Sequence, residues 1–295
     1  MHGPRARSRA RFPATPLPPC DRMIRESAHG PTIAPPPPAP PPAPVDAAVL
    51  IRRVETLAEY RECVALQEET WGEGFSERVP SSVLLVTQKL GGVVVGAFRP
   101  DGTLVGFVFG MTGPMHGRLV HWSDMLAVRP EARGGGIGER LKRHQRELVR
   151  ALGVETMHWT FDPLVARNAR LNLVRLGARA TEYVPNMYGD STGSPLHGAM
   201  PTDRLVVSWD LTRDDAPPVA PDAPRARIAV PHDVHALPPE ERADWRATTR
   251  AAFLDHLARG YAIVAFQRGD GHELPYYELA RVDGSTNAAG TERPS

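Results

Sequence analysis

Residues 126–141 read Leu126-Ala-Val-Arg-Pro-Glu-Ala-Arg-Gly-Gly-Gly-Ile-Gly-Glu-Arg-Leu141. The apolar residues before Pro130 predict the end of a β-strand. The spacing of Ile137, Leu141, Leu148 and Leu152 predicts one apolar stripe of an α-helix, which Gly153 ends. The glycines between strand and helix let the backbone approach a ligand, and a helix N-terminus offers unpaired N–H groups. The stretch therefore predicts a cradle for a phosphate or pyrophosphate.

Two common phosphate motifs do not fit this stretch. A dinucleotide fingerprint would need a glycine where Glu139 or Leu141 stands. A P-loop would need a lysine after a glycine, and neither Lys89 nor Lys142 follows one. What remains is Val128-x-Pro-x-x-Arg-Gly-x-Gly-Ile-Gly-x-x-Leu141, which resembles the acetyl-CoA pyrophosphate loop of the GNAT acyltransferase superfamily.

Periodicity and turn signals predict the other elements. We expect strands at 49–54, 93–98, 104–111, 119–128, 156–161, 178–184 and 204–211, and helices at 56–70, 81–89, after the glycine loop and at 165–176. This order resembles that of the GNAT superfamily. The resemblance implies an α/β (α+β) fold, in which helices flank a mixed, mostly antiparallel sheet, with a smaller C-terminal α/β unit.

Composition divides the 295 residues into five segments. Residues 1–47 are rich in proline and arginine, which predicts a disordered tail. We expect the acyltransferase domain at 48–212, a proline-rich linker at 213–226, a small α/β unit at 227–283 and a loose tail at 284–295. The small unit is expected to pack on the first domain because it is too short for a large core of its own. One face of its expected helix carries Trp245, Thr249, Ala252, Phe253 and Leu257.

Charge, hydropathy and cysteine content argue against several classes of protein. The net charge of +1 gives no sign of a nucleic-acid partner, and no apolar run is long enough to span a membrane. Cys20 and Cys63 form no disulfide framework, which indicates a reducing compartment, and we expect a cytoplasmic protein. His232 and His235 are too closely spaced for a metal site, so no metal is expected. The sequence leaves monomer and homodimer open.

The resemblance also implies which residues bind acetyl-CoA or another acyl-CoA as co-substrate. Leu126 and Val128 would offer backbone groups to the pantetheine arm. The pyrophosphate would be held by Arg133, Gly134, Gly136 and Gly138. Arg140 and Arg143 either reach the phosphates or lie on a solvated helix face. Trp159-Thr-Phe-Asp-Pro-Leu164 and the C-terminal unit resemble one subgroup of the superfamily; this wider likeness supplies no substrate.

In the GNAT mechanism an amine attacks the thioester directly, a base removes the amine proton, and an acid protonates the thiolate. Asp124 lies in an apolar strand, where a carboxylate is costly unless paired or functional. It shares strand parity with Leu126 and Val128, which would place all three on one face. We expect Asp124 to be the general base; the alternative is a structural hydrogen bond.

The family's usual acid, a tyrosine four residues before the glycine that ends the helix, falls on Leu173. Tyr188, or less favourably Tyr183, is expected to replace it; the alternative for each is packing. His121 is expected to be a satisfied core or surface histidine. Asp162, before Pro163, is either a turn aspartate or a substrate contact. The irregular stretch 186–201 offers an acceptor pocket or lid.

The sequence thus predicts an acyl-CoA-dependent N-acyltransferase, of the acetyl type, whose acceptor is a small-molecule amine. The alternative, favoured by Leu173, is a non-catalytic protein of the same fold that binds or senses acyl-CoA. An enzyme with a different acyl donor is a third possibility.

Overall fold

The computed structural model describes residues 49–189, 192–195, 200–213, 223–269 and 272–281. The expected tails at 1–47 and 284–295, and most of the expected linker, lie outside these residues. The strands are β1 (Leu50–Arg53), β2 (Val93–Phe98), β3 (Leu104–Met115), β4 (Arg118–Val128), β5 (Thr156–Phe161), β6 (Arg179–Val184), β7 (Arg204–Asp210), β8 (Arg225–Ala229), β9 (Tyr261–Gln267) and β10 (Tyr276–Arg281). The helices are α1 (Leu57–Trp71), α2 (Ser81–Lys89), α3 (Ile137–Arg150), α4 (Ala166–Ala169) and α5 (Pro239–Ala258), with short turns η1 (Pro130–Ala132), η2 (Arg170–Arg175) and η3 (Val234–Ala236).

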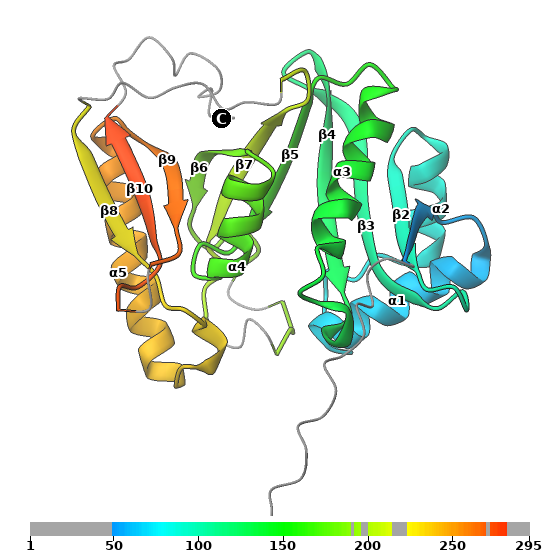
Figure 1. The fold of residues 1–295 in the computed structure, drawn as a ribbon, viewed down its shortest axis with the longest axis horizontal. Coiled ribbons are helices and arrows are strands. Elements are labelled where there is room, and N and C mark those ends of the chain that lie inside the picture. Colours follow the sequence, from blue (N-terminus) through cyan, green and yellow to red (C-terminus); the bar gives the residue numbers. More distant parts are fainter. Residues whose placement is uncertain (1–48, 190–191, 196–199, 214–222, 270–271, 282–295) are drawn as a thin grey trace, which may run out of the picture. The chain divides into compact units, whose positions relative to one another are not determined.

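Two sheets organise the described chain (Figure 1). The larger has seven strands in the order β1-β2-β3-β4-β5-β7-β6, and the smaller has the order β8-β10-β9. Every pair in both sheets is antiparallel except β4 and β5, which are parallel. The predicted mixed sheet with a smaller C-terminal unit is confirmed.

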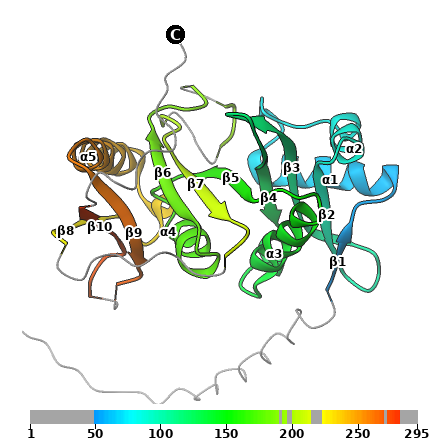
Figure 2. The same ribbon diagram turned by 90° about the horizontal axis from the view of Figure 1, so that it is seen from above.

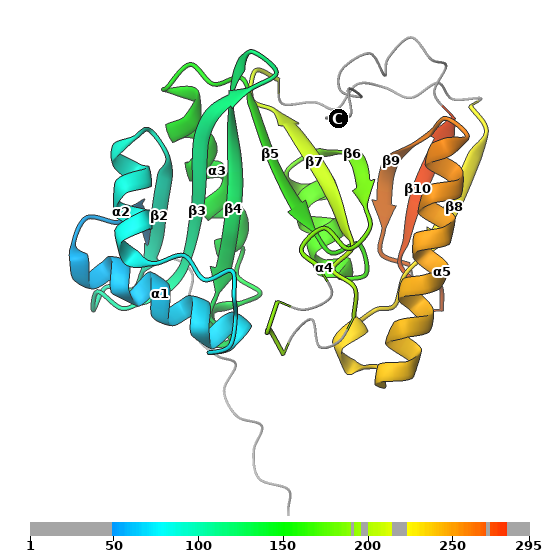
Figure 3. The ribbon, with the colours of Figure 1, turned by 180° about the vertical axis from the view of Figure 1, so that it is seen from behind.

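Helices cover both faces of the larger sheet. Seen from above, α3 and α4 lie on one side and α1 and α2 on the other (Figure 2); the view from behind shows α1 and α2 over β2 and β3 (Figure 3). Strand β2 is buried throughout and divides its side chains by parity. Val93 and Val95 join the core under α3, while Val94 and Phe98 join the core under α1 and α2.

The C-terminal helix α5 packs against the edge strand of the larger sheet. Its Phe253 ring stacks on Tyr183 of β6 and meets Tyr277 of β10, each at 5.1 Å between centroids. Phe253 is fully buried. The aromatic contacts therefore join the two sheets through one shared core.

The buried face of α3 differs from the predicted apolar stripe. The helix ends at Arg150, and Leu152 lies beyond it with 43% of its surface exposed. Lys142, Gln145 and Arg146 are buried instead, beside Ile137, Leu141 and Val149. The predicted stripe was wrong at Leu152, whereas Leu148 is partly buried against the core. Periodicity did not predict the buried polar residues, because their partners lie on other elements of the fold.

None of the helices in the described part of the chain has the length and apolar composition needed to cross a bilayer.

Candidate active site

The glycine loop has the predicted strand–turn–helix form. Strand β4 ends at Val128, η1 follows, and α3 begins at Ile137. Gly134 and Gly136 have φ values of +94° and +78°, which non-glycine residues rarely adopt. A Cβ at either position would meet no atom within 4 Å, so these glycines face open space. They are required by backbone conformation and not by packing.

The loop leaves a run of backbone donors unused. No hydrogen bond among the described residues uses the N–H groups of 134–139; the first bond of α3 runs from Arg140 N to Gly136 O at 3.0 Å. Glu139, in the first turn, is held away by Arg143 and Arg175 at 2.9 and 2.6 Å. The arrangement is that of an anion site at a helix N-terminus.

Three arginines near this loop are already engaged. Arg133 Nε donates to Val128 O at 2.9 Å. Arg143 donates to Glu139 and to Arg175 O, and Arg140 Nη2 donates to Val49 O at 2.6 Å. Arg140 and Arg143 are thus both bonded to neighbouring protein groups, and their contact with the CoA phosphates stays a prediction.

Strands β4 and β5 pair at one end only. They share the pairs His121–Met157 and Trp122–His158 and then diverge (Figure 1). From residue 123 to Val128, β4 has no strand partner on its β5 side within the described residues. Leu126 and Val128, partly buried against the α3-side core, lie along this unpaired edge.

Asp124 is an extra residue in β4. Gly110 of β3 pairs with Ser123, and the preceding Phe109 pairs with Met125. One residue of β3 thus spans two of β4, which defines a β-bulge at Asp124. The bulge locally interrupts the ladder just where β4 and β5 separate.

The bulge overturns the parity argument for Asp124. Ser123 Oγ donates to Gln145 Oε1 on α3 at 2.8 Å, and Leu126 packs in the core on that same face. Regular alternation would put these two residues on opposite faces. Strand parity therefore does not place Asp124 on the face of Leu126 and Val128, and its role as general base stays a prediction.

The surroundings of Asp124 favour its neutral form. Desolvation by the surrounding protein raises the pKa of this carboxyl, and the charge of Glu77, which follows α1, raises it further. The side chain is nevertheless exposed to solvent. A carboxyl that solvent reaches and that has a raised pKa has the properties of a general base.

His121 is a satisfied core histidine, as expected. It is fully buried, with Nδ1 2.9 Å from Thr112 Oγ1 and Nε2 3.0 Å from Gln145 Nε2. Thr112 donates its own proton to Gly91 O, so it accepts from Nδ1–H, and Nε2 accepts from Gln145. Burial, with a smaller effect of Lys142, lowers the pKa of His121 to about 3. Gly110 leaves room for this ring, because a Cβ there would overlap Nε2.

Tyr188 lies across the divergence from β4. Its hydroxyl is 3.1 Å from Thr160 Oγ1 on β5, two residues beyond the last pair with β4. Its backbone N donates to Thr202 Oγ1 at 2.9 Å, and Thr202 N donates to Asn186 Oδ1 at 3.2 Å. These bonds fix the turn that carries Tyr188.

Residues after this turn contact the segment that follows α1. Ser76 N and Oγ both donate to Thr192 O, at 2.9 and 3.2 Å. Pro195 lies so close to Gly72 that a Cβ on Gly72 would clash with the Pro195 ring. The described residues of the predicted lid thus contact the segment between α1 and α2.

Tyr183, the less favoured candidate acid, is buried. Its hydroxyl donates to Asp203 Oδ2 at 2.5 Å, and burial raises its pKa. Asp203 also accepts from Asn186 N and from Arg250 of α5. Burial alone would raise the pKa of Asp203, but Arg250 and Tyr183 hold it below its ordinary value. Tyr183 therefore supports the Tyr188 turn and does not reach the divergence.

Asp162 is both a turn aspartate and an ion-pair partner. Its Oδ1 accepts from Leu164 N at 2.9 Å, and its Oδ2 accepts from Arg246 of α5 at 2.5 Å. Arg204 Nη1 lies 3.8 Å from the same oxygen. Sequence reasoning missed Arg246 and Arg250, because no local pattern marks an arginine whose partner is 84 or 47 residues away.

The helix before Gly177 is not a continuous α-helix. After α4, residues Arg170–Arg175 form a π-helical turn in which Leu176 N donates to Leu171 O. Leu173 is partly buried against the core. Asn172, within the turn, accepts from Trp159 Nε1 at 3.1 Å. The segment offers no hydroxyl at the position of the family's tyrosine.

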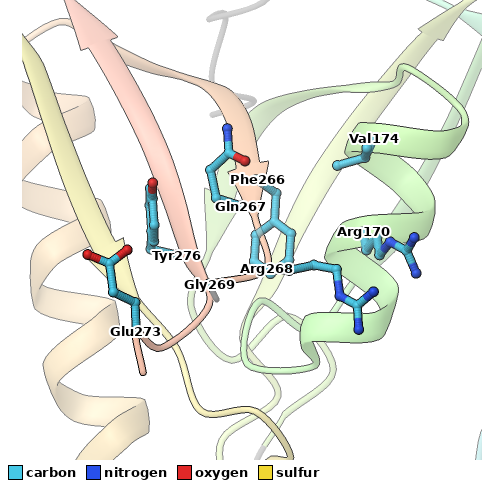
Figure 4. A pocket seen from close by; sticks show the side chains of 8 residues that line it. All are labelled: Arg170, Val174, Phe266, Gln267, Arg268, Gly269, Glu273 and Tyr276. Atoms are coloured by element: carbon cyan, nitrogen blue, oxygen red, sulfur yellow. The ribbon is translucent and has the colours of Figure 1, made fainter. Parts of the chain in front are cut away.

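A hollow of about 460 Å³ lies elsewhere, between η2 and the C-terminal sheet (Figure 4). Its walls include Arg170 and Val174 on one side and Phe266, Arg268, Glu273 and Tyr276 on the other. None of the site residues predicted from the sequence lines it.

Part of the chain is similar to known acetyltransferases. Residues 56–177 match the acetyltransferase (GNAT) family. Similar solved structures include the N-acetyltransferase from Staphylococcus aureus Mu50, with 14% identity over 55% of this chain and 98% of that one, at a TM-score of 0.45. The aminoglycoside 6'-acetyltransferase type Ii is 18% identical over 58% of this chain and 99% of that one, at a TM-score of 0.44. Arabidopsis thaliana Naa50, solved in complex with the bisubstrate analogue CoA-Ac-MVNAL, is 17% identical over 56% of this chain and 99% of that one, at a TM-score of 0.44. No curated protein sequence matches the chain.

Proposed function

We propose that this chain transfers an acyl group, in the first place acetyl, from acyl-CoA to a small-molecule amine, because residues 56–177 match the acetyltransferase (GNAT) family. The observation that carries the proposal is the unpaired run of N–H groups at 134–139, beside the divergence of β4 and β5. The run suits the pyrophosphate and the divergence suits the extended pantetheine arm.

The donor half of the site follows the chain from loop to strand. Gly134, Gly136 and Gly138 give the pyrophosphate access to backbone donors, and Arg133 adds positive charge. Leu126 and Val128 offer the backbone groups of an unpaired strand edge to the pantetheine amides. The thioester then lies near the bulge at Asp124.

Asp124 and Tyr188 are proposed to move the protons. The amine nitrogen bonds to the thioester carbon, the carbon–sulfur bond breaks, and the products are an amide and CoA. Asp124 accepts the proton that the amine loses, and its raised pKa suits that task. Tyr188, bonded to Thr160 beside the divergence, donates a proton to the thiolate in place of the tyrosine absent at Leu173.

A small acceptor is supported by the contacts around Tyr188. Thr192 is bonded to Ser76, and Pro195 is close to Gly72, so this side of the site is bridged by protein. Such a bridge leaves less room for a long peptide than for a compact amine.

The test is acetyl transfer to a panel of amines, measured as thiol release from acetyl-CoA. Asp124→Asn is expected to lower turnover by about 10²–10⁴-fold and to flatten the acid limb of the pH profile. Tyr188→Phe is expected to lower turnover while CoA affinity stays constant, since only a hydroxyl is removed. Asp244→Asn and Tyr276→Phe, away from the divergence, serve as matched controls. Unchanged turnover in both site variants would overturn these roles.

The alternative function is non-catalytic binding or sensing of acyl-CoA, which Leu173 favours. It predicts tight binding of acetyl-CoA without transfer to any amine in the panel. Calorimetric titration with acetyl-CoA, run beside the transfer assay, separates the two.

A further inference from the structure

Thr160 on β5 shares a hydrogen bond with the Tyr188 hydroxyl. The distance between Thr160 Oγ1 and the Tyr188 oxygen is 3.1 Å, and either atom can be the donor. Thr160 lies two residues beyond His158, the last residue of β5 that pairs with β4, so it stands where the two strands diverge. On its other side Thr160 pairs with Val206 of β7, which fixes its backbone. The Thr160 hydroxyl is therefore held by a sheet strand and not by a loop.

The turn that carries Tyr188 is also fixed, by bonds to its backbone. Asp203 Oδ1 accepts from Asn186 N at 2.9 Å, and Asn186 Oδ1 accepts from Thr202 N at 3.2 Å. Thr202 Oγ1 in turn accepts from Tyr188 N at 2.9 Å. With both backbones held in this way, the bond between the Tyr188 and Thr160 side chains is a stable feature of the fold.

The direction of this bond decides what the phenol can do. A hydroxyl group donates one proton and accepts through its lone pairs. If Tyr188 donates to Thr160, its single proton is occupied and cannot reach a thiolate. If Thr160 donates to Tyr188, the tyrosine proton is free to point into the divergence. Only the second arrangement suits the acid that is proposed above.

A hydrogen bond from Thr160 also makes the proton transfer easier. A phenol is ordinarily a weaker acid than a thiol, so transfer from a phenol to a thiolate is uphill. The phenolate that remains is stabilised by a donated hydrogen bond, because a charged acceptor binds a donor more strongly than a neutral one. The Arg204 guanidinium, 5.3 Å from the centre of the Tyr188 ring, adds positive charge nearby.

We propose that Thr160 is a positioning residue, which donates a hydrogen bond to the Tyr188 oxygen while Tyr188 protonates the CoA thiolate. This inference rests on the proposed function and on Tyr188 as its acid. In the step, the O–H bond of Tyr188 breaks and a sulfur–hydrogen bond forms. The phenolate keeps the hydrogen bond from Thr160 and then takes a proton from water, which reaches Tyr188 because 36% of this residue is exposed.

The test measures thiol release from acetyl-CoA by the full chain, with the fastest-reacting amine of the panel. Thr160→Val keeps the size of the side chain and removes its hydroxyl. It is expected to lower kcat on the order of tenfold, while KM for acetyl-CoA is unchanged. Thr160→Ser, which keeps the hydroxyl, is expected to restore kcat. Thr156→Val, earlier on the same strand and paired with Asp210, is the matched control and is expected to leave kcat unchanged.

A double-variant cycle separates action through Tyr188 from a general structural effect. In a Tyr188→Phe background, Thr160→Val is expected to lower kcat no further, because the oxygen that Thr160 serves is absent. Thr160→Ala serves the same comparison if the valine variant does not fold.

The outcomes distinguish this inference from the proposed function. A wild-type kcat in Thr160→Val, or the same loss with and without the Tyr188 hydroxyl, would overturn the role of Thr160 alone. If Tyr188→Phe keeps wild-type turnover, the proposed acid fails and Thr160 has no acid to position. A wild type that binds acetyl-CoA but transfers to no amine would overturn the transferase proposal and this inference together.

Discussion

The buried network around His121 predicts a defined loss of stability in acid. In the unfolded chain the histidine pKa is 6.5, whereas burial lowers it to about 3 in the folded chain. As the pH falls below 6.5, the unfolded chain takes up a proton that the folded chain does not. Each pH unit below that value then costs about 1.36 kcal/mol of unfolding free energy, until the folded pKa is reached. At pH 5 the cost is about 2 kcal/mol.

Urea denaturation of the full chain at pH 7 and pH 5, followed by tryptophan fluorescence, measures this cost. The stability of the wild type changes between the two pH values through every group that titrates there. His121→Gln is expected to lose about 2 kcal/mol less than wild type over that interval, because the titrating ring is gone. Other histidines contribute equally to both proteins and cancel in the difference.

Ser123→Ala is the matched control. It removes the Ser123–Gln145 hydrogen bond from the same network but no titrating group. It is expected to be less stable than wild type by about 1 kcal/mol at both pH values, with an unchanged pH difference. If His121→Gln and wild type lose the same stability between pH 7 and pH 5, the ring is not held neutral by burial and the reasoning fails.

Three further predictions address the donor site, the core and the tail. Gly136→Asp should weaken CoA binding tenfold or more, since a carboxylate near phosphate is repelled by about 1–4 kcal/mol; calorimetry checks this against Gly117→Asp, a positive-φ glycine in equally open space before the start of β4, at the opposite end of that strand from the glycine loop. Lys142→Met should raise the melting temperature, with about 1–3 kcal/mol of added stability, because burial lowers the pKa of Lys142 well below its ordinary value and its Nζ contacts the Trp159 ring and the Met157 sulfur; a lower melting temperature would contradict it. A chain that begins at Asp46 should match the full chain in melting temperature and CoA affinity, because residues 1–47 lack an apolar pattern; a large drop in either would show that they pack on the domain.

The donor half of the site could be predicted because its signals are local. A strand, a glycine run and a helix stand within the sixteen residues quoted from Leu126 to Leu141. Positive φ at Gly134 and Gly136 is a property of single residues, and the free N–H groups follow from where α3 begins. Neither depends on what lies across the sheet.

The position of Asp124 could not be predicted from strand alternation. Alternation holds only while each residue of β4 faces one residue of β3, and the bulge breaks that count. The available signal was Gly110 on the neighbouring strand, where a side chain would collide with His121. This signal can be used only if Gly110 and His121 are known to be neighbours, and the tertiary structure alone shows that.

The acceptor half depends on contacts that span the chain. The family match ends at residue 177, before the Tyr188 turn and before α5. Yet Arg250 binds Asp203, Asp203 accepts from Asn186 N, and Asn186 accepts from Thr202, which holds Tyr188. In the roles proposed above, the matched segment binds the donor, and the acid comes from the part of the chain that follows it. Through Arg250, the C-terminal helix helps to hold the turn that presents this acid.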